Sequence, residues 1–195
     1  LAACADADFV TGEGQRLGIP TSYGGPYVGL FSCRQLHIRQ MPRRMSGRTI
    51  DRDGNTGYVL TLQTREQLIR RERATSNICT SVGLIALMAT VFMAAQGRQG
   101  LSHVARLCYH KAHYAASLIE AIPGYSLPLN GTFFREFVVT CPRTPSEINR
   151  LLLEHGIIGG LDISAQVPNG MLLCCTELNT REEIESLAGA LAEIG

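Results

Sequence analysis

The amino-acid sequence predicts an α/β fold, and three observations support this prediction. Two short apolar runs flank a glycine-rich loop early in the chain, as in a pair of strands. A long apolar stretch in the middle follows good N-capping residues and predicts a helix. The last third alternates apolar runs of strand length with capped, helix-like segments. At 195 residues, the chain is long enough for one domain, or for one small domain and part of another.

The first predicted elements are strands near residues 7–11 and 27–33, joined by a loop rich in glycine. This loop lacks the G-x-G-x-x-G spacing, and a strand rather than a helix follows it, so the dinucleotide-binding fingerprint fails. The plain interpretation is a structured loop whose glycines take positive φ angles.

The next segment, residues 34–48, holds five arginines and predicts a solvated helix end and turn, with an anion or partner contact as the alternative. Residues 51–54 (DRDG) predict a turn into a strand over 58–62. Arg and Glu alternate at helical spacing over 65–73, which predicts a charged, exposed helix.

From residue 75 the character of the sequence changes, and we place a domain boundary there: 1–75 and 76–195. Capping residues at 75–77 open a helix that Gly97 and Gly100 stop, and a second helix ends near Pro123, so the two form a hairpin. The run 82–95 is typical of a buried helix and too short to span a bilayer.

The remaining elements predict a small α+β domain. They are a strand at 132–140, a capped helix at 144–155, strands near 157–163 and 171–176, and a terminal helix that starts at the Asn179–Thr180 cap.

Composition excludes several classes of protein. A net charge of +1, aromatic residues at 6% and no Trp argue against nucleic-acid or membrane-surface binding. Five His without ligand spacing predict no metal site, and His110 and His113 resemble a solvated pair. No secretory signal opens the chain, which favours a reducing, cytoplasmic compartment.

Cysteine and lysine usage is informative. The seven cysteines form no C-x-x-C pair, and Cys174 and Cys175 lie in an apolar run that predicts two small buried side chains. Cys79 begins a helix, where its pKa could fall, but we expect a buried, unreactive thiol. The only lysine is Lys111, expected on a helix surface, so any Schiff-base chemistry in this chain must use it.

A long motif between Gly12 and Thr80 resembles the glycine decarboxylase P-protein family. GEGQRLGIPTSYGGPYVGLFSCR and VLTLQTREQLIRRERATSNICT carry the resemblance, which continues through FFREFVV, HGIIGGLDI and LLCCTE. Within the family, the chain looks like subunit 1 of the two-subunit bacterial form.

The resemblance implies the C-terminal part of a type I pyridoxal phosphate (PLP) enzyme fold, aminotransferase-like: the end of the large-domain sheet and a small α+β domain. The family enzyme decarboxylates glycine and transfers the aminomethyl group to the lipoyl arm of the H-protein. The resemblance sets Gln15 at the position of the PLP lysine, and Gln cannot form an imine. It therefore implies that subunit 2 carries the PLP, and that this chain has no catalytic residue and is inactive alone.

Two groups of site residues follow. Glycine-rich turns and capped helix starts present backbone N–H groups to a neighbour, so we expect the subunit interface at Tyr23, Gly24, Gly25, Pro26, Thr75, Asn77 and Cys79. By resemblance, Gln63, Thr64 and Arg65 reach the phosphate of the partner's PLP across the interface. The alternative is that Thr64 only caps its own helix, with Gln67 completing a capping box.

Two other functions remain open at this point. In the first, the chain is a scaffold that stabilises the catalytic subunit or docks the H-protein. In the second, it is a self-sufficient PLP enzyme similar to cysteine desulfurases. The lysine count argues against the second.

Overall fold

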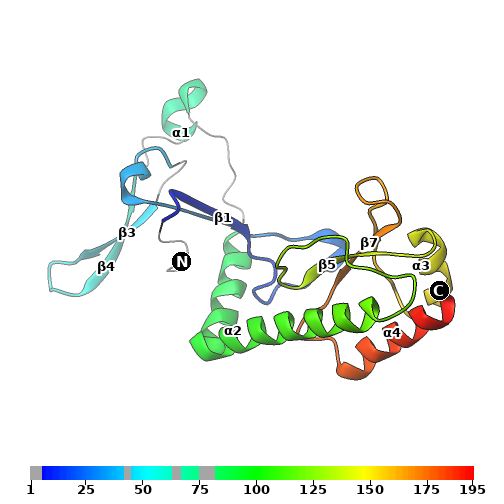
Figure 1. Ribbon diagram of the computed structural model, residues 1–195. Helices are drawn as coiled ribbons and strands as arrows, with labels where there is room; N and C mark the ends of the chain where they lie inside the picture. Colours follow the sequence, from blue (N-terminus) through cyan, green and yellow to red (C-terminus); the bar gives the residue numbers. More distant parts are fainter. Residues whose placement is uncertain (1–5, 42–44, 63–66, 75–81) are drawn as a thin grey trace. The chain divides into compact units, whose positions relative to one another are not determined.

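The computed structural model describes residues 6–41, 45–62, 67–74 and 82–195 (Figure 1). The chain divides into two compact units, Leu1–Ala95 and Gln96–Gly195. One long helix, α2, begins in the first unit and ends in the second.

Two antiparallel strand pairs make up the β-structure described in the first unit. In the first pair, Phe9 lies opposite Cys33; in the second, Met45 lies opposite Thr61. The strands are β1 (Phe9–Glu13), β2 (Gly29–Cys33), β3 (Met45–Ile50) and β4 (Thr56–Thr61). Strands were predicted near the positions of β1, β2 and β4, and these predictions are confirmed.

Strand β3 corrects the prediction of a helix end and turn over residues 34–48. A short 3-10 turn, Gln35–His37, is present, but the segment ends in a strand. Half-buried and exposed residues alternate over the first four positions of β3, and the last two residues are exposed. The Thr61 hydroxyl donates to the Met45 carbonyl at 2.9 Å. The pairing with β4 therefore overrides the arginine-rich local pattern.

The predicted turn between β3 and β4 is confirmed. The Asp51 carboxylate accepts hydrogen bonds from the backbone N–H groups of Asp53 (2.9 Å) and Asn55 (2.8 Å). Hydrogen bonds to its carboxylate lower the pKa of Asp51, and the bond from the Asn55 backbone N–H has the largest effect. Gly54 takes a φ of 86°, which favours glycine.

The charged segment after β4 is helical where the structure describes it. Helix α1 (Gln67–Arg70) passes into a 3-10 turn over Arg71–Arg73. All side chains described in these two turns are exposed, as predicted.

Helix α2 (Gly83–Glu120) is broken at Gly97, where φ is 61° and ψ is −178°. Only glycine readily takes these angles, so Gly97 separates two helical stretches as predicted. Gly100 lies inside the second stretch, so the predicted stop there is wrong. Among the residues that the structure describes, no helix is both long enough and apolar enough to cross a membrane.

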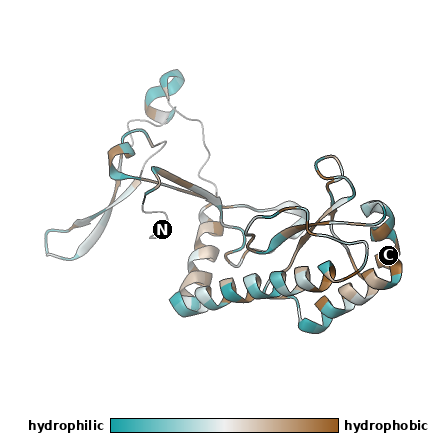
Figure 2. Ribbon diagram, viewed as in Figure 1, coloured by the Kyte–Doolittle hydropathy of each residue, from teal (hydrophilic) through white to brown (hydrophobic). Residues whose placement is uncertain are grey.

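The stretch of α2 before Gly97 corrects the prediction of a buried helix. Ala89 is its only buried residue, whereas Leu84, Leu87 and Val91 are more than half exposed. Figure 2 shows the apolar colouring along this stretch. The apolar sequence is therefore not matched by burial among the described residues.

The second unit is a three-stranded antiparallel sheet with the order β5-β7-β6, together with helices (Figure 1). Its elements after α2 are β5 (Glu136–Thr140), α3 (Pro145–Glu154), β6 (Leu161–Asp162), β7 (Gly170–Cys174) and α4 (Arg181–Ile194). One core joins the sheet to α2, α3 and α4. Its most deeply buried side chains include Ala112, Ile119, Val139, Ile148, Leu152, Met171 and Leu191.

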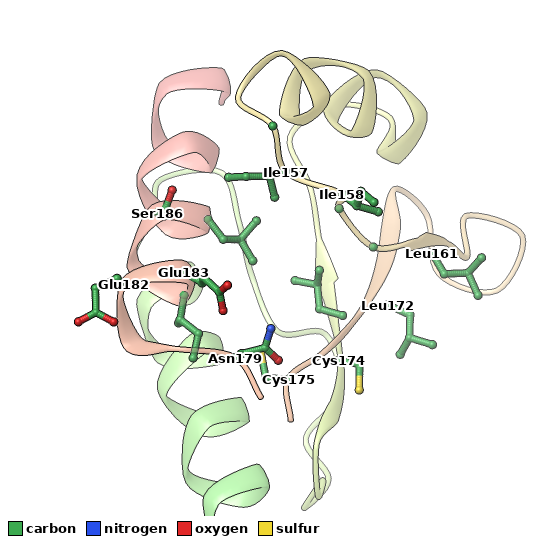
Figure 3. A pocket seen from close by; sticks show the side chains of 16 residues that line it. Ile157, Ile158, Leu161, Leu172, Cys174, Cys175, Asn179, Glu182, Glu183 and Ser186 are labelled. Atoms are coloured by element: carbon green, nitrogen blue, oxygen red, sulfur yellow. The ribbon is translucent and has the colours of Figure 1, made fainter. Parts of the chain in front are cut away.

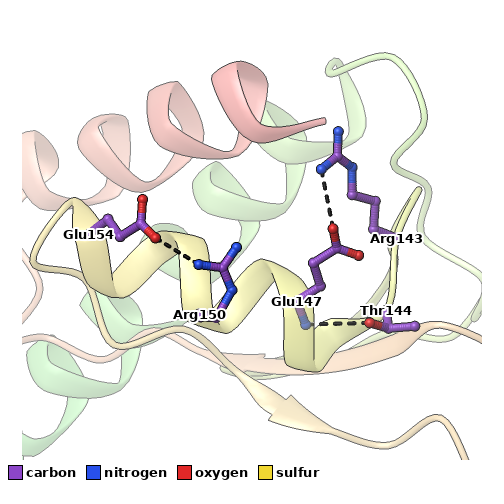
Figure 4. Close-up of polar contacts among 5 residues, drawn as sticks. All are labelled: Arg143, Thr144, Glu147, Arg150 and Glu154. Atoms are coloured by element: carbon purple, nitrogen blue, oxygen red, sulfur yellow. Dashed lines mark hydrogen bonds and ion pairs between the residues drawn. The ribbon is translucent and has the colours of Figure 1, made fainter.

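Both predicted helix caps in this unit are confirmed. The Thr144 hydroxyl accepts from the Glu147 N–H at 3.4 Å, and ion pairs spaced four residues apart follow along α3 (Figure 4). At α4, Thr180 and Glu183 form a reciprocal capping box, with distances of 3.1 and 2.8 Å.

The strand predicted over 157–163 is shortened to the two residues of β6. A Cβ at Gly160 would lie 2.5 Å from the Leu172 carbonyl oxygen, so only glycine fits against β7 there. The Asn149 amide donates to the Gly160 carbonyl at 2.8 Å.

Candidate functional site

The glycine-rich loop between β1 and β2 is closed at its base by one carboxylate. Glu13 Oε1 accepts from the Gln15 N–H at 2.9 Å and from the Val28 N–H at 2.8 Å. The Gly14 N–H donates to the Val28 carbonyl at 2.8 Å. Contacts between residues some fifteen positions apart fix the two ends of the loop together, so its middle projects from a defined base.

The same loop is anchored on the first stretch of α2. Ile19 and Val28 are buried against Ala89. Gly18 has a φ of 81°, and a Cβ built there would lie 2.7 Å from Phe92. Glycine is therefore required at position 18 by both its backbone angle and its close neighbour.

The predicted interface residues Tyr23, Gly24, Gly25 and Pro26 form the outer part of this loop. Tyr23 has a φ of 58° and is fully exposed. Nothing lies within 4 Å of a Cβ built on Gly25, and the backbone of that residue is extended. The structure thus brings these four residues together on an exposed turn.

Gln15, at the position that the family resemblance gives to the PLP lysine, lies inside this loop. Its side-chain amide donates to the Pro26 carbonyl at 3.3 Å. An amide nitrogen is not a nucleophilic amine, so Gln15 cannot hold PLP covalently. Its observed contact instead ties the base of the loop to the predicted interface turn.

The other predicted site residues lie outside the described part of the chain. These are Gln63, Thr64 and Arg65 before α1, and Thr75, Asn77 and Cys79 before α2. Their roles stay predictions.

Lys111, the only lysine, binds backbone carbonyls in the second unit. Its Nζ donates to the carbonyls of Glu177 and Asn179, each at 2.5 Å. One turn earlier on α2, the buried Cys108 thiol donates to the Glu177 carboxylate at 3.1 Å. Lys111 is thus half-buried and hydrogen-bonded to the segment before α4, which corrects the prediction of a helix-surface lysine. No local sequence signal indicates this, because its partners lie more than sixty residues away.

In the histidine pair and the adjacent cysteines, His110 is exposed and Cys175 is buried as predicted, whereas His113 and Cys174 differ from prediction. His113 stacks on Phe133 with ring centroids 4.0 Å apart, and its Nε2 lies 3.1 Å from the Phe133 carbonyl, so it is packed rather than solvated. Cys174 is exposed and Cys175 is buried, because successive strand residues face opposite sides. Burial raises the pKa of Cys175 to about 11. No cluster suited to a metal ion occurs among the residues described.

Solved structures of low sequence identity define the class of fold. A cysteine desulfurase of Escherichia coli, CsdA, matches with a TM-score of 0.60 at 18% identity, over 97% of this chain and 46% of its own. A sphingosine-1-phosphate lyase of Burkholderia pseudomallei matches with a TM-score of 0.62 at 16% identity, over 97% and 38%. The chain is therefore α/β and shares the fold of the matched part of these type I PLP-fold enzymes.

Sequence comparison then identifies the family. Residues 2–191 match the sequence model of the glycine cleavage system P-protein, and the chain belongs to this family. A crystal structure of an inhibitor-bound glycine decarboxylase (P-protein) matches with a TM-score of 0.90 at 38% identity, over 97% of this chain and 44% of that one.

Similar curated sequences are probable glycine dehydrogenase (decarboxylating) subunit 1 proteins. The relative from Thermomicrobium roseum is 57% identical over 96% of this chain and 42% of its own length. The relative from Desulforamulus reducens is 52% identical over 96% and 43%. The chain thus spans less than half the length of the relatives it matches.

Proposed function

We propose that this chain belongs to the subunit of a glycine decarboxylase that does not bear PLP. The observation that carries the proposal is the contact of Lys111, whose Nζ donates to two backbone carbonyls. Gln15 stands at the position that the family resemblance gives to the PLP lysine, and its side-chain amide donates to the Pro26 carbonyl. Both side chains have structural roles, and neither is an amine free to bond to a cofactor.

The residues present do not fit covalently bound PLP. PLP withdraws electrons from the substrate carbon in enzymes of this fold, and a lysine of the protein holds it. A lysine held by two carbonyls cannot at the same time be that lysine. In this proposal the cofactor is bound to subunit 2, and the 195 residues contribute structure and an interface.

The proposed assembly decarboxylates glycine and passes the aminomethyl group to the lipoylated H-protein, in the bacterial cytoplasm. Support comes from the family membership and from the names of the similar sequences. Within it, 1–75 would be the end of the large PLP-enzyme-like domain, and 76–195 would be the helical pair with the small α+β domain.

The decisive experiment is glycine–CO2 exchange. Subunit 2 is assayed alone and with the whole subunit that contains this sequence, and we expect exchange only with both. Exchange by subunit 2 alone, with this subunit raising only its stability, would instead favour the scaffold function. A PLP absorbance band in this subunit alone that Lys111→Ala abolishes would refute the proposal.

A first prediction concerns the proposed interface at the Tyr23–Pro26 turn. Gly25→Leu should weaken co-purification with subunit 2 by about tenfold or more, because the leucine side chain would collide with the partner subunit at the proposed interface. Within this chain the leucine has room, since nothing lies within 4 Å of a Cβ built on Gly25. The unfolding midpoint should not change. Gly189→Leu, which is equally open but lies on α4, is the matched control and should leave assembly intact. Unchanged assembly of Gly25→Leu would place the interface elsewhere.

A second prediction concerns Thr64. We propose that its hydroxyl donates to the phosphate of the partner's PLP, with Gln63 and Arg65 supporting the contact. Thr64→Val in the assembled enzyme should weaken PLP retention by about 1–2 kcal/mol, as expected for a lost hydrogen bond to a charged group. Equilibrium dialysis of PLP measures this.

Thr64→Ser keeps the hydroxyl and is the control for this prediction. It should retain PLP like the parent enzyme. If Thr64→Val lowers only the thermal stability and leaves PLP affinity unchanged, Thr64 is a helix cap and the phosphate contact is wrong.

A further inference from the structure

The sequence contains two Asn-Gly pairs, Asn130–Gly131 and Asn169–Gly170. In such a pair the backbone nitrogen of the glycine can attack the side-chain amide carbon of the asparagine. Glycine favours the attack because it has no Cβ to hinder the approach and takes many backbone angles. The attack also needs a glycine N–H that no other group holds. The surroundings of each glycine nitrogen therefore decide which pair reacts.

The first pair lies in the irregular segment 127–135 that precedes β5. Asn130 and Gly131 are both exposed, and nothing lies within 4 Å of a Cβ built on Gly131. Within the described part of the chain, neither the Asn130 side chain nor the Gly131 N–H has a hydrogen-bond partner. The amide carbon and the nitrogen that attacks it are thus both accessible to each other and to solvent.

The second pair is held by the fold. The Gly170 N–H donates to the Val167 carbonyl at 2.7 Å, and Gly170 is buried. Gly170 is also the first residue of β7 and pairs with Thr140 of β5. Later residues of the same strand line a pocket of about 610 Å³ (Figure 3). A reaction at Asn169 must therefore break a hydrogen bond and distort the end of the sheet.

We propose that Asn130 is a site of spontaneous deamidation and that the fold protects Asn169. In the first step the Gly131 nitrogen bonds to Asn130 Cγ, the Cγ–Nδ2 bond breaks, and the proton of the nitrogen leaves with ammonia. Water then opens the resulting cyclic imide at either of its two carbonyls and gives aspartate or isoaspartate. One water is consumed, one ammonia is released, and nothing is oxidised or reduced.

The modification changes the charge and the main chain without requiring the fold to change. The new carboxylate takes the formal net charge of the 195 residues from +1 to zero. Isoaspartate also adds a methylene to the main chain beside Gly131, which lines a groove of about 150 Å³. Because the space around Gly131 is open, the modified form should accumulate in the folded protein. The proposal does not depend on which subunit bears PLP.

Peptide mapping tests the proposal. The whole subunit that contains this sequence is kept folded in mildly alkaline buffer, and samples are unfolded and digested with trypsin over time. Cleavage at Lys111 and Arg135 encloses Asn130, whereas Asn169 falls in a different peptide, so mass spectrometry measures the two rates separately. Asn130 should react about tenfold or more faster, because the buried hydrogen bond at Gly170 must open first. In the subunit kept unfolded in urea, the two rates should agree within about twofold.

Gly131→Ala separates the attack by this nitrogen from general lability of the loop. The methyl group has room, but it hinders the approach to Asn130, so deamidation there should slow by about tenfold or more. The rate at Asn169 should not change, and Gly189→Ala, which also enters open space, should change neither rate. Three results would overturn the proposal: equal rates at the two asparagines in the folded subunit, a rate difference that persists in urea, or an unchanged rate at Asn130 in Gly131→Ala.

Discussion

Lys111→Met should lower the free energy of unfolding by about 3–6 kcal/mol, because two hydrogen bonds from an ammonium group are lost and each contributes about 1.5–3 kcal/mol. Methionine keeps the length of the side chain and its packing on α2, so the loss isolates the contacts to Glu177 and Asn179. Urea unfolding at neutral pH measures the change.

Arg106→Met is the matched control for this substitution. Arg106 is an exposed cation on the same helix, and its replacement should change the stability by less than about 0.5 kcal/mol. The PLP absorbance of the assembled enzyme should survive Lys111→Met. A variant with normal stability but without PLP absorbance would mean that Lys111 holds the cofactor.

Gly160→Ala should destabilise the second unit by about 1–3 kcal/mol, the usual cost of inserting a methyl group into a filled space. The added Cβ would lie 2.5 Å from the Leu172 carbonyl oxygen and 2.6 Å from Met171 Cγ. The first of these atoms belongs to the backbone of β7 and cannot move without disturbing the sheet.

Gly189→Ala provides the comparison. Its Cβ would enter open space on helix α4, so it should stabilise the chain by about 0.5–1 kcal/mol, as alanine does in helices. The two substitutions add the same atom and should have opposite signs in urea unfolding. Equal effects would show that residue 160 has more room than the packing against β7 allows.

Local signals in the sequence predicted much of the fold. The caps at Thr144 and Thr180 involve side chains three residues from the groups they bind, so the pattern alone locates the starts of α3 and α4. Gly97 similarly marks the break in α2. Strand pairing is less local, and β3 was missed because it begins at the end of the arginine-rich segment 34–48 and is made a strand by its partner β4.

The candidate site depends on contacts that sequence cannot show. Lys111 meets carbonyls far along the chain, and the opposite exposures of Cys174 and Cys175 follow from the pleat of β7 rather than from their identical chemistry. The apolar stretch of α2 before Gly97 predicted burial, but apolarity cannot say what covers a helix, and the chain spans less than half the length of its relatives.

The hydrogen bonds of Lys111 to two backbone carbonyls also determine which chemical labels suit this chain. Reagents that cross-link or label lysine amines find a single Nζ, and that one is held by two carbonyls. Proximity maps built on such reagents would therefore report almost no neighbours for these residues, however large the true contact surface. Carboxylate-directed coupling is better suited, since exposed Glu182 and Glu193 lie on α4, and the Cys174 thiol gives a second handle.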